Sequence, residues 1–322
     1  MVTGRTGIGA LLTGVILAAN SAAAEDFAFE IGATYDRTQL DAEQTITTAG
    51  GSIFNSNDVD TDAYRLFGSW YFAGLSDDKG PRRRAAFVDR ASVLNIGYAR
   101  TDVSIAASFV STDPMFPSFD GDFDSDGDAY VLDVRYVWRD SGWFADAGVV
   151  NANVSIGGIV NDSVDSTAWR LGVGKYLFET TTLALDFSQA DDEGSDATSY
   201  SATFSHLGDM GANWQYAVDL GYTQTDADFN LDLDIWSAAL SLYPNRDFEF
   251  GVRISEQDAD ASVRDGTSYE GFLSWFVTPS VVLAARYRID DIGFLGNVQL
   301  GAAESTSDAE QDSVGLSVSV RF

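Results

Sequence analysis

The C-terminal segment 312–322 constrains the fold of this chain more strongly than any other stretch. Apolar residues fill every second position, and small or polar residues fill the positions between them. Successive side chains of a β-strand point to opposite sides, so the segment predicts a strand with one apolar and one polar face. The residues of the apolar face are Val314, Leu316, Val318, Val320 and Phe322.

The same period recurs along the chain and predicts an all-β fold. In the clearest instance, 128–139, Tyr130 and Leu132 alternate with Asp133 and Arg135. Further strands are expected at 26–38, 61–72, 88–101, 143–155, 166–178, 182–190, 198–207, 213–225, 231–243, 248–256, 267–277 and 281–289. Most of these runs are long enough to cross a bilayer when tilted. We expect an antiparallel up-and-down arrangement of about 14 strands, or of about 12 or 16 if 73–111 divides differently.

The ending of the chain resembles the C-terminal signature of Gram-negative outer-membrane β-barrel proteins, through this alternation and the terminal Phe322. The resemblance implies a closed, porin-like transmembrane β-barrel in the outer membrane, in contact with lipid and lipopolysaccharide. It also implies that the barrel-assembly machinery reads Val314, Leu316, Val318, Val320 and Phe322. The specific motif covers only these residues, and the rest of the chain matches the barrel class by its strand pattern.

Residues 1–24 have the order of a cleaved secretory signal peptide. A basic residue precedes the apolar run 7–19, and small residues precede a cleavage site after Ala24. The apolar run is too short to span a bilayer as a helix. We therefore expect export through the periplasm and a mature chain, 25–322, that forms a single barrel domain. A buried N-terminal helix is the alternative.

The connections between the predicted strands alternate in length. Short turns are expected at 140–142, 179–181, 244–247 and 278–280. Long connections are expected at 39–60, 102–127 and 290–311. Outer-membrane barrels have short periplasmic turns and longer outer loops. With an even number of strands, both termini would lie on the periplasmic side.

Charge and tryptophan are sorted in the same way. Most acidic residues lie in or beside the long connections, where Arg264 is the only basic residue. The tryptophans at strand ends beside short connections are Trp70, Trp138, Trp143, Trp214 and Trp275. Amphipathic rings at one depth form the aromatic girdle of a membrane interface. A soluble β-sandwich offers no reason for this sorting.

Composition excludes several classes of function. A net charge of −30 argues against nucleic acid as a partner, because phosphate binding needs clustered basic residues. The chain has no cysteine, and its only histidine, His206, falls on the outward face of its strand. Cys–His nucleophile pairs and His–Cys metal sites are therefore excluded. We expect no enzymatic activity and no cofactor.

If the apolar strand faces meet lipid, the alternate positions face the interior of the barrel. These candidate pore-lining residues are Arg65, Asp133, Arg135, Asp146, Arg170, Asp186, Asp219, Glu249, Arg253, Glu270, Arg286 and Arg288, followed by Arg321. Charges of both signs predict either a water-filled pore or a lumen closed by ion pairs. We favour a channel for ions and small hydrophilic solutes, with weak cation selectivity from the acidic outer loops. The alternative is a structural or adhesive barrel with a plugged lumen and acidic surface loops.

The acidic segment 120–128 is a weak candidate for calcium. Its aspartates match the start of an EF-hand loop. However, Asp133 at the twelfth position would lie about 17 Å from Asp128 along a strand, so it cannot close the site. A partial site of Asp122, Asp124 and Asp126 is one interpretation, and a solvated acidic loop is the other. The surrounding connection could also fold into the lumen as a constriction. Both a monomer and a homotrimer are compatible with the sequence.

Overall fold

The chain forms one closed barrel. The residues that the computed structural model describes are 26–48, 51–76, 79–111, 118–156, 162–192, 195–211, 214–228, 231–259, 266–292 and 304–322. Within them, fourteen antiparallel strands each pair with their neighbours in sequence, and β1 (Asp26–Thr48) pairs with β14 (Glu304–Arg321) to close the barrel. The all-β fold, the up-and-down order and the number of strands are confirmed. The candidate signal peptide, 1–24, lies outside the described residues.

The remaining elements follow in chain order around the barrel. The strands are β2 (Gly51–Ser76), β3 (Val93–Ser111), β4 (Phe119–Trp138), β5 (Trp143–Ile156), β6 (Asp162–Phe178), β7 (Thr181–Asp192), β8 (Ser195–Asp209), β9 (Gln215–Ala227), β10 (Leu231–Asn245), β11 (Phe248–Ala259), β12 (Gly266–Thr278) and β13 (Val281–Ile292). A 3₁₀ helix η1 (Arg82–Arg84) and a short α-helix α2 (Ala85–Val88) lie between β2 and β3. Among the described residues, no helix is both long enough and apolar enough to cross a membrane.

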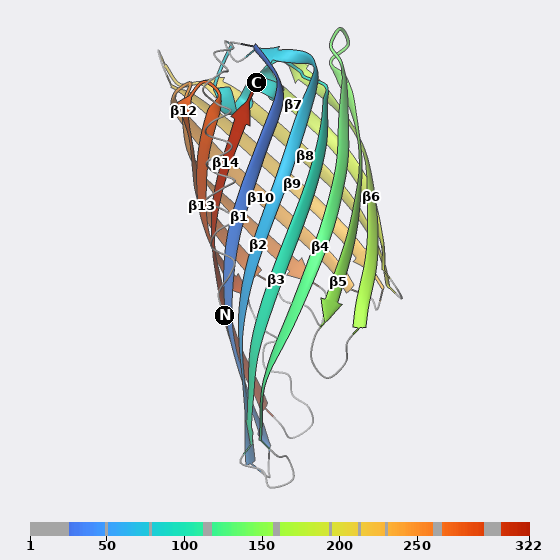
Figure 1. Cartoon of the computed structure of the whole chain (residues 1–322), viewed down its shortest axis with the longest axis vertical. Coiled ribbons are helices and arrows are strands. Elements are labelled where there is room, and N and C mark those ends of the chain that lie inside the picture. The colour runs from blue at the N-terminus through green and yellow to red at the C-terminus, as the bar shows by residue number, and fades with distance from the viewer. Residues whose placement is uncertain are drawn as a thin grey trace.

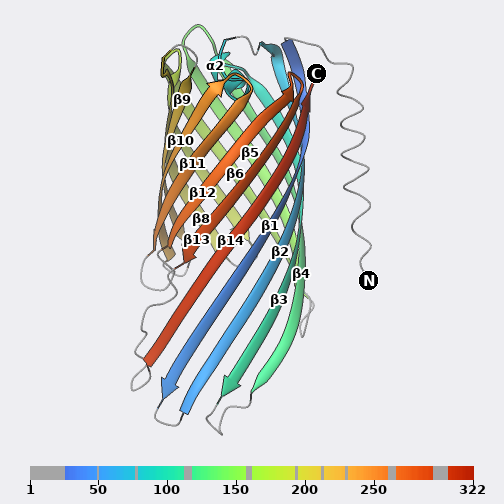
Figure 2. The same cartoon turned by 90° about the vertical axis from the view of Figure 1, so that its left-hand side faces the viewer.

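The two ends of the barrel differ. One end, which we call the turn end, holds the short connections 139–142, 179–180, 246–247 and 279–280. β1 begins and β14 ends at this turn end, as predicted for an even number of strands (Figures 1 and 2). We call the opposite end the loop end.

The apolar strand faces point outward, as the alternation predicts. Leu132, Leu171 and Leu185 are 47%, 54% and 58% exposed although their side chains are large and apolar. Monomeric proteins in water rarely expose a continuous apolar surface of this kind. It matches the lipid-facing band of a membrane barrel, in which apolar and polar residues alternate between outside and inside.

Aromatic side chains frame this apolar band on both sides. The five tryptophans predicted beside the short turns are all exposed. A second girdle, which was not predicted, lies toward the loop end and includes the ring pairs Tyr35–Tyr64 (5.2 Å), Tyr98–Tyr130 (5.3 Å) and Tyr222–Trp236 (4.4 Å). On β4, Trp138 and Tyr130 are separated by about 27 Å along the strand, or about 20 Å across a bilayer when the strand is tilted. The two girdles therefore delimit a band of membrane dimensions.

Strands β1 to β4 and β14 continue beyond the second girdle at the loop end (Figure 2). The long connections predicted at 39–60 and 102–127 are wrong, because paired strand fills most of both segments. The connection predicted at 290–311 is also too long, since β14 already begins at Glu304. Beyond the girdle both faces of a strand meet water, so backbone pairing continues without apolar alternation. A pattern that relies on apolar residues ends such strands too early.

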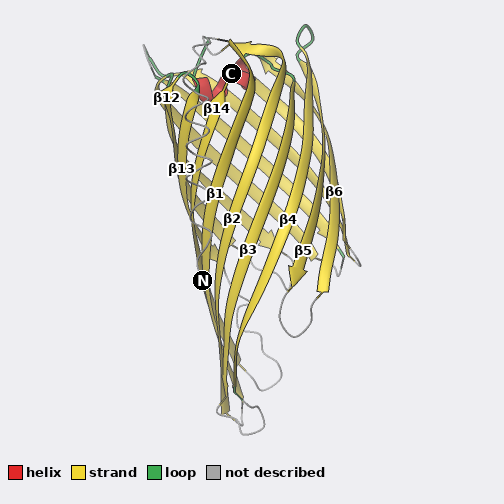
Figure 3. Ribbon diagram, viewed as in Figure 1, coloured by secondary structure: helices red, strands yellow, loops and turns green. Residues whose placement is uncertain are grey.

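The connection between β2 and β3 is much longer than the short turns at the same end of the barrel. It folds into the mouth of the barrel at the turn end, where η1 and α2 lie inside the ring of strands (Figure 3). We call this segment, residues 79–92, the plug.

The plug contacts the wall on several sides. Phe87 packs against Tyr176 of β6 at 5.7 Å between ring centroids. Phe87 and Val88 also pack against a buried cluster from β8, β9 and β10. On the far side, Arg321 of β14 donates a hydrogen bond of 2.9 Å to the backbone oxygen of Arg82. Because these strands lie around the circumference, the plug crosses the mouth.

Replacing Gly174 with alanine is expected to destabilise the barrel wall beside the plug by about 1–3 kcal/mol. A Cβ atom there would lie 2.1 Å from the ring of Phe144, which is almost fully buried, and 2.8 Å from the Leu183 backbone oxygen. Gly271→Ala is the matched control, because a Cβ atom there would meet nothing within 4 Å. Denaturant midpoints followed by tryptophan fluorescence should fall for the first variant only. Equal midpoints would show that the wall relaxes around the added methyl group.

Candidate functional site: the barrel lumen

Charged side chains line the inside of the barrel and pair with one another, between neighbouring strands, across an intervening strand or along one strand. The structure places the predicted pore-lining residues on the strand positions that face this interior. Most of them take part in ion pairs or hydrogen bonds, and the paired ones are Asp133, Arg135, Asp146, Arg170, Asp219, Glu249, Arg253, Glu270, Arg286, Arg288 and Arg321. The lumen is therefore a ladder of fixed charges and not an apolar core.

One part of this ladder lies on β4 to β7. Arg135 donates two hydrogen bonds to Asp146, of 2.7 and 3.1 Å, which is the bidentate geometry that suits a guanidinium and a carboxylate. Arg170 reaches Asp133 at 2.6 Å. Asp186 lies beside Gly172, where an added Cβ would come within 2.2 Å of its carboxylate oxygen. The glycine thus makes room for a third carboxylate on this wall.

A second part spans the seam where β14 meets β1. Arg286 donates two hydrogen bonds to one oxygen of Asp36, at 2.8 and 3.0 Å. Nearer the turn end, Arg321 donates to Glu30 at 2.9 Å, and Ser319 donates to the other oxygen of Glu30 at 2.7 Å. The bonds of Arg321 and Ser319 join the last strand to the first in addition to the backbone ladder, and the bonds of Arg286 join β13 to β1 across β14.

The plug is tied into the same network. Arg84 of η1 forms an ion pair with Asp219 of β9, and its Nε donates a hydrogen bond of 2.9 Å to the Tyr243 hydroxyl. The Tyr243 hydroxyl in turn donates a hydrogen bond of 2.7 Å to Glu249, which also accepts a hydrogen bond of 2.9 Å from Ser274. Burial alone would lower the pKa of Arg84, but its bonds to Asp219 and Tyr243 raise it. The guanidinium therefore stays charged, as an anchor of the plug.

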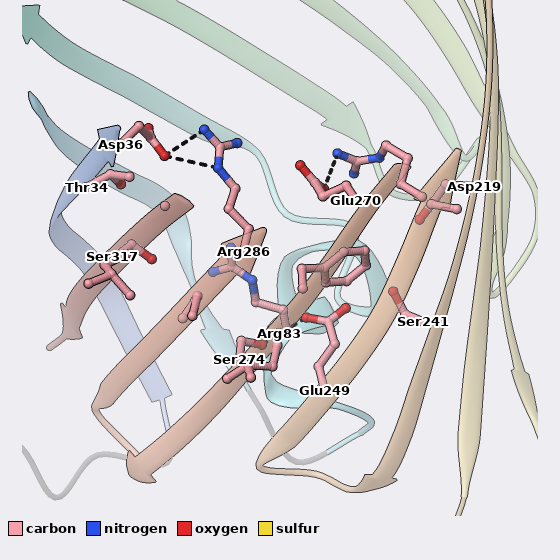
Figure 4. A pocket seen from close by; sticks show the side chains of 18 of the residues that line it. Thr34, Asp36, Arg83, Asp219, Ser241, Glu249, Glu270, Ser274, Arg286 and Ser317 are labelled. Atoms are coloured by element: carbon pink, nitrogen blue, oxygen red, sulfur yellow. Dashed lines mark hydrogen bonds and ion pairs between the residues drawn. The ribbon is translucent and has the colours of Figure 1, made fainter. Parts of the chain in front are cut away.

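A polar cavity of about 540 Å³ lies inside the barrel, on the side of the plug that faces the loop end (Figure 4). Arg83 and Arg84 contribute to it from the plug, and strands β9 to β14, β1 and β2 contribute the rest. Its charged lining residues are Asp36, Arg65, Arg83, Arg84, Asp219, Glu249, Arg253, Glu270 and Arg286. Hydroxyl groups of Thr34, Ser241, Ser274 and Ser317 also line it, beside apolar residues such as Phe272. The cavity is thus a water-compatible chamber.

The fold is shared with solved outer-membrane proteins. The barrel is similar to outer membrane protein Omp33 of Acinetobacter baumannii, with a TM-score of 0.52, 15% identity, and coverage of 92% of this chain and 99% of that one. It is also similar to the toluene transporter TodX of P. putida, with a TM-score of 0.58, 12% identity, and coverage of 92% and 90%. No protein-family model and no curated protein matches the chain. These likenesses establish the barrel fold.

The C-terminal motif lies on the outer face of β14. Val314, Leu316 and Phe322 are exposed there, whereas Val318 and Val320 share the face by alternation and are buried. Phe322 stacks on Phe29 of β1 at 5.9 Å between ring centroids. The motif therefore belongs to the seam that closes the barrel.

The aspartates considered for calcium lie on β4 and not in a loop. Asp122, Asp124 and Asp126 occupy alternate positions and are exposed, so neighbouring ones are about 7 Å apart along the strand. Within the described part of the chain, no group of three His, Cys, Asp or Glu side chains converges as metal ligands do. Calcium binding by this segment stays a prediction that has no preformed site.

The other special positions can be placed as well. His206 lies at the end of β8, where its Nδ1 is 2.8 Å from the Thr181 hydroxyl and its ring contacts Tyr216. The predicted connection at 102–127 does not form a constriction in its described residues, which continue β3 and β4. Residues 112–117, at its tip, lie outside the described residues.

Several site residues were not predicted. Glu30, Asp36 and Asp290 lie on inward positions of β1 and β13, so the alternation that identified their arginine partners could have identified them too. The plug arginines could not be found in this way, because they lie between strands. Their only local signals are Pro81 before a run of three arginines and the unusual length of the connection.

Proposed function

We propose that this protein is a porin-like channel in the outer membrane of a Gram-negative bacterium, through which ions and small hydrophilic solutes diffuse passively. The observation that carries the proposal is the polar, charged chamber enclosed by a barrel with an apolar exterior. A water-compatible lumen inside a lipid-compatible wall has the physical form of a conduit. The shared fold with Omp33 and with the transporter TodX supports it.

The same proposal includes a location and partners. The apolar band between two aromatic girdles suits a bilayer, with lipid and lipopolysaccharide as its surroundings. Export through the periplasm would use residues 1–24 as a cleaved signal peptide. The turn end would face the periplasm and the loop end the outside. Monomer and homotrimer are both compatible with this arrangement, and the function needs neither a cofactor nor an enzymatic step.

The plug limits what the channel can pass. Because it crosses the mouth, a solute must pass beside it or wait for it to move. Liposome swelling with sugars of increasing size tests this directly. Swelling with the smallest sugars and none with trisaccharides supports a narrow diffusion channel, whereas no swelling with any sugar contradicts it.

The acidic loop end is expected to make the channel weakly selective for cations. Acidic side chains such as Asp58, Asp60 and Asp62 on β2 would concentrate cations at the loop end. In a KCl gradient the reversal potential should have the sign of a potassium preference at low salt. The preference should shrink near 1 M salt, where the screening length is only about 3 Å. Anion preference at low salt would contradict the proposal.

The C-terminal residue is expected to govern assembly. Phe322→Ala should reduce the amount of folded barrel in the outer membrane, because it removes the terminal aromatic residue that the assembly machinery is proposed to read. Phe178→Ala, which removes an exposed phenylalanine at the turn end of β6 outside the motif, is the control. Heat-modifiable migration in gels measures the folded fraction. Unchanged yield of the Phe322 variant would contradict the role of this residue as a signal.

A second candidate function is a structural or adhesive barrel with a plugged lumen. The plug and the ion pairs around it are the specific observation that favours it. The exposed, acidic strand extensions at the loop end would then be the functional surface, and calcium bound by Asp122, Asp124 and Asp126 would belong to this function. Absence of solute passage from verified folded protein would favour this candidate over the channel.

A further inference from the structure

We propose that the chamber above the plug binds a small carboxylate that carries hydroxyl groups, through Arg65 of β2 and Arg83 of the plug. The inference rests on the proposed channel function, since it assigns a solute class to the lumen. It runs against the overall charge of the protein, which is −30.

The charges of the chamber do not follow the charge of the chain. Among its lining residues are five arginines and four carboxylates. Three of the arginines, Arg84, Arg253 and Arg286, each hold an ion pair with one of these carboxylates. The chamber is thus a polar cavity whose lining carries more positive than negative charge.

The two remaining arginines have open donor groups. Within the described part of the chain, Arg65 and Arg83 form no hydrogen bond and no ion pair, and both line the chamber. Figure 4 shows Arg83 on the chamber wall beside Arg286. Arg83 is near enough to Glu30 to interact electrostatically, but both oxygens of Glu30 already accept bonds from Ser319 and Arg321. Each open guanidinium has five N–H donors in a planar fork that matches a carboxylate.

The carboxylates of the chamber are not available to a cation in the same way. Glu249 accepts hydrogen bonds from the hydroxyl groups of Tyr243 and Ser274. Glu270 accepts a hydrogen bond of 3.0 Å from Arg253. Asp36 accepts two bonds from Arg286 on one oxygen, and its second oxygen is buried without a partner. The surplus of hydrogen-bonding capacity that faces the chamber is therefore a surplus of cationic donors.

The size and the neutral lining narrow the ligand class further. A volume of about 540 Å³ falls in the range of small-molecule sites. The hydroxyl groups of Thr34, Ser241 and Ser317 can both donate and accept, as a polyol requires. A carboxylate with several hydroxyl groups uses both features, whereas an apolar acid would use only the arginines. Because Arg83 belongs to the plug and Arg65 to the wall, such a ligand would also bridge the two.

Isothermal titration of the folded, detergent-solubilised full-length protein with sodium D-gluconate tests the site at low salt. Sorbitol, in which a hydroxymethyl group replaces the carboxylate, is the matched neutral probe. Gluconate is expected to bind and sorbitol is not. Arg65→Gln and Arg83→Gln should each weaken gluconate binding by about tenfold, since each removes a charge-assisted hydrogen bond. Lysine at either position should recover part of the loss, because it keeps the charge.

The control variant is Arg37→Gln, which removes an equally charged side chain from an exposed pair with Asp60 outside the chamber. Its gluconate affinity should match the unaltered protein. Equal binding of sorbitol, no binding of gluconate, or unchanged affinity in the double variant Arg65→Gln with Arg83→Gln would overturn the site. Channel currents are recorded on the same samples. Current without gluconate binding removes the site and leaves the channel, and binding without current removes the channel and leaves the site.

Discussion

Replacing Glu30 with alanine is expected to lower the free energy of unfolding by about 3–5 kcal/mol. Glu30 and Arg321 are each about 95% buried, and the variant would leave the arginine without its carboxylate. Arg321 also lies over the rings of Phe27 and Phe276, 4.7 Å from each centroid, so it cannot easily swing into water. The loss falls on the seam between the first and last strands, where the barrel closes. Equilibrium unfolding in urea measures it.

Two further variants separate the mechanism from a general effect of mutation. Arg37→Ala breaks an ion pair between neighbouring strands that is about half exposed on both sides, and should cost less than about 1 kcal/mol. The double variant Glu30→Leu with Arg321→Met should recover most of the loss, because apolar residues of similar volume remove the unpaired charge. A Glu30 variant as stable as the Arg37 variant would show that the seam does not depend on this buried pair.

Replacing Arg84 with alanine is expected to loosen the plug and raise the current through the barrel. The variant loses both bonds to Asp219 and the bond to Tyr243. Because Asp219 is 32% exposed, the loss is taken as about 2–3 kcal/mol, below the range for fully buried pairs. That corresponds to an increase of about 30- to 150-fold in the population of the undocked plug. Conductance and protease cleavage within residues 79–92 should rise together.

The control for the plug is Lys79→Ala. Lys79 begins the same segment, but it is 63% exposed and its pair with Asp89 lies within the plug itself. The Lys79 side chain lies in water, and Asp89 keeps the hydrogen bond that it accepts from the Ser76 backbone nitrogen, so current and cleavage should stay near those of the unaltered protein. Cleavage without higher current in the Arg84 variant would mean that the plug moves but does not limit the pathway.

The sequence predicts those parts of the fold that lipid dictates. Between the girdles, each strand must present apolar residues on one face, and this period locates Leu132 and Trp138 on the outside of β4 and Asp133 on the inside. The same rule correctly yields fourteen strands. It fails beyond Tyr130, where β4 continues as paired backbone with aspartates on its outward positions, because water on both faces imposes no pattern.

The lumen was accessible to prediction only in part. Alternation assigns Arg286 and Arg321 to the interior, but it does not say which carboxylate each one meets, since partners such as Asp36 and Glu30 are brought close only by closure of β1 against β14. The plug depends on still more distant contacts. Arg84 and Asp219 are separated by 135 residues, and nothing local to either residue indicates the other.

Single-channel recording of the purified, refolded protein in a planar bilayer tests the central claim most directly. If the barrel is an open channel, the unaltered protein should give stable conductance steps, and Arg84→Ala should give larger steps under the same conditions. If heat-modifiable migration shows that both proteins are folded and neither gives conductance steps, the result would contradict the proposed channel function. The barrel would then be closed by its lumen network, and its function would belong to the acidic extensions at the loop end.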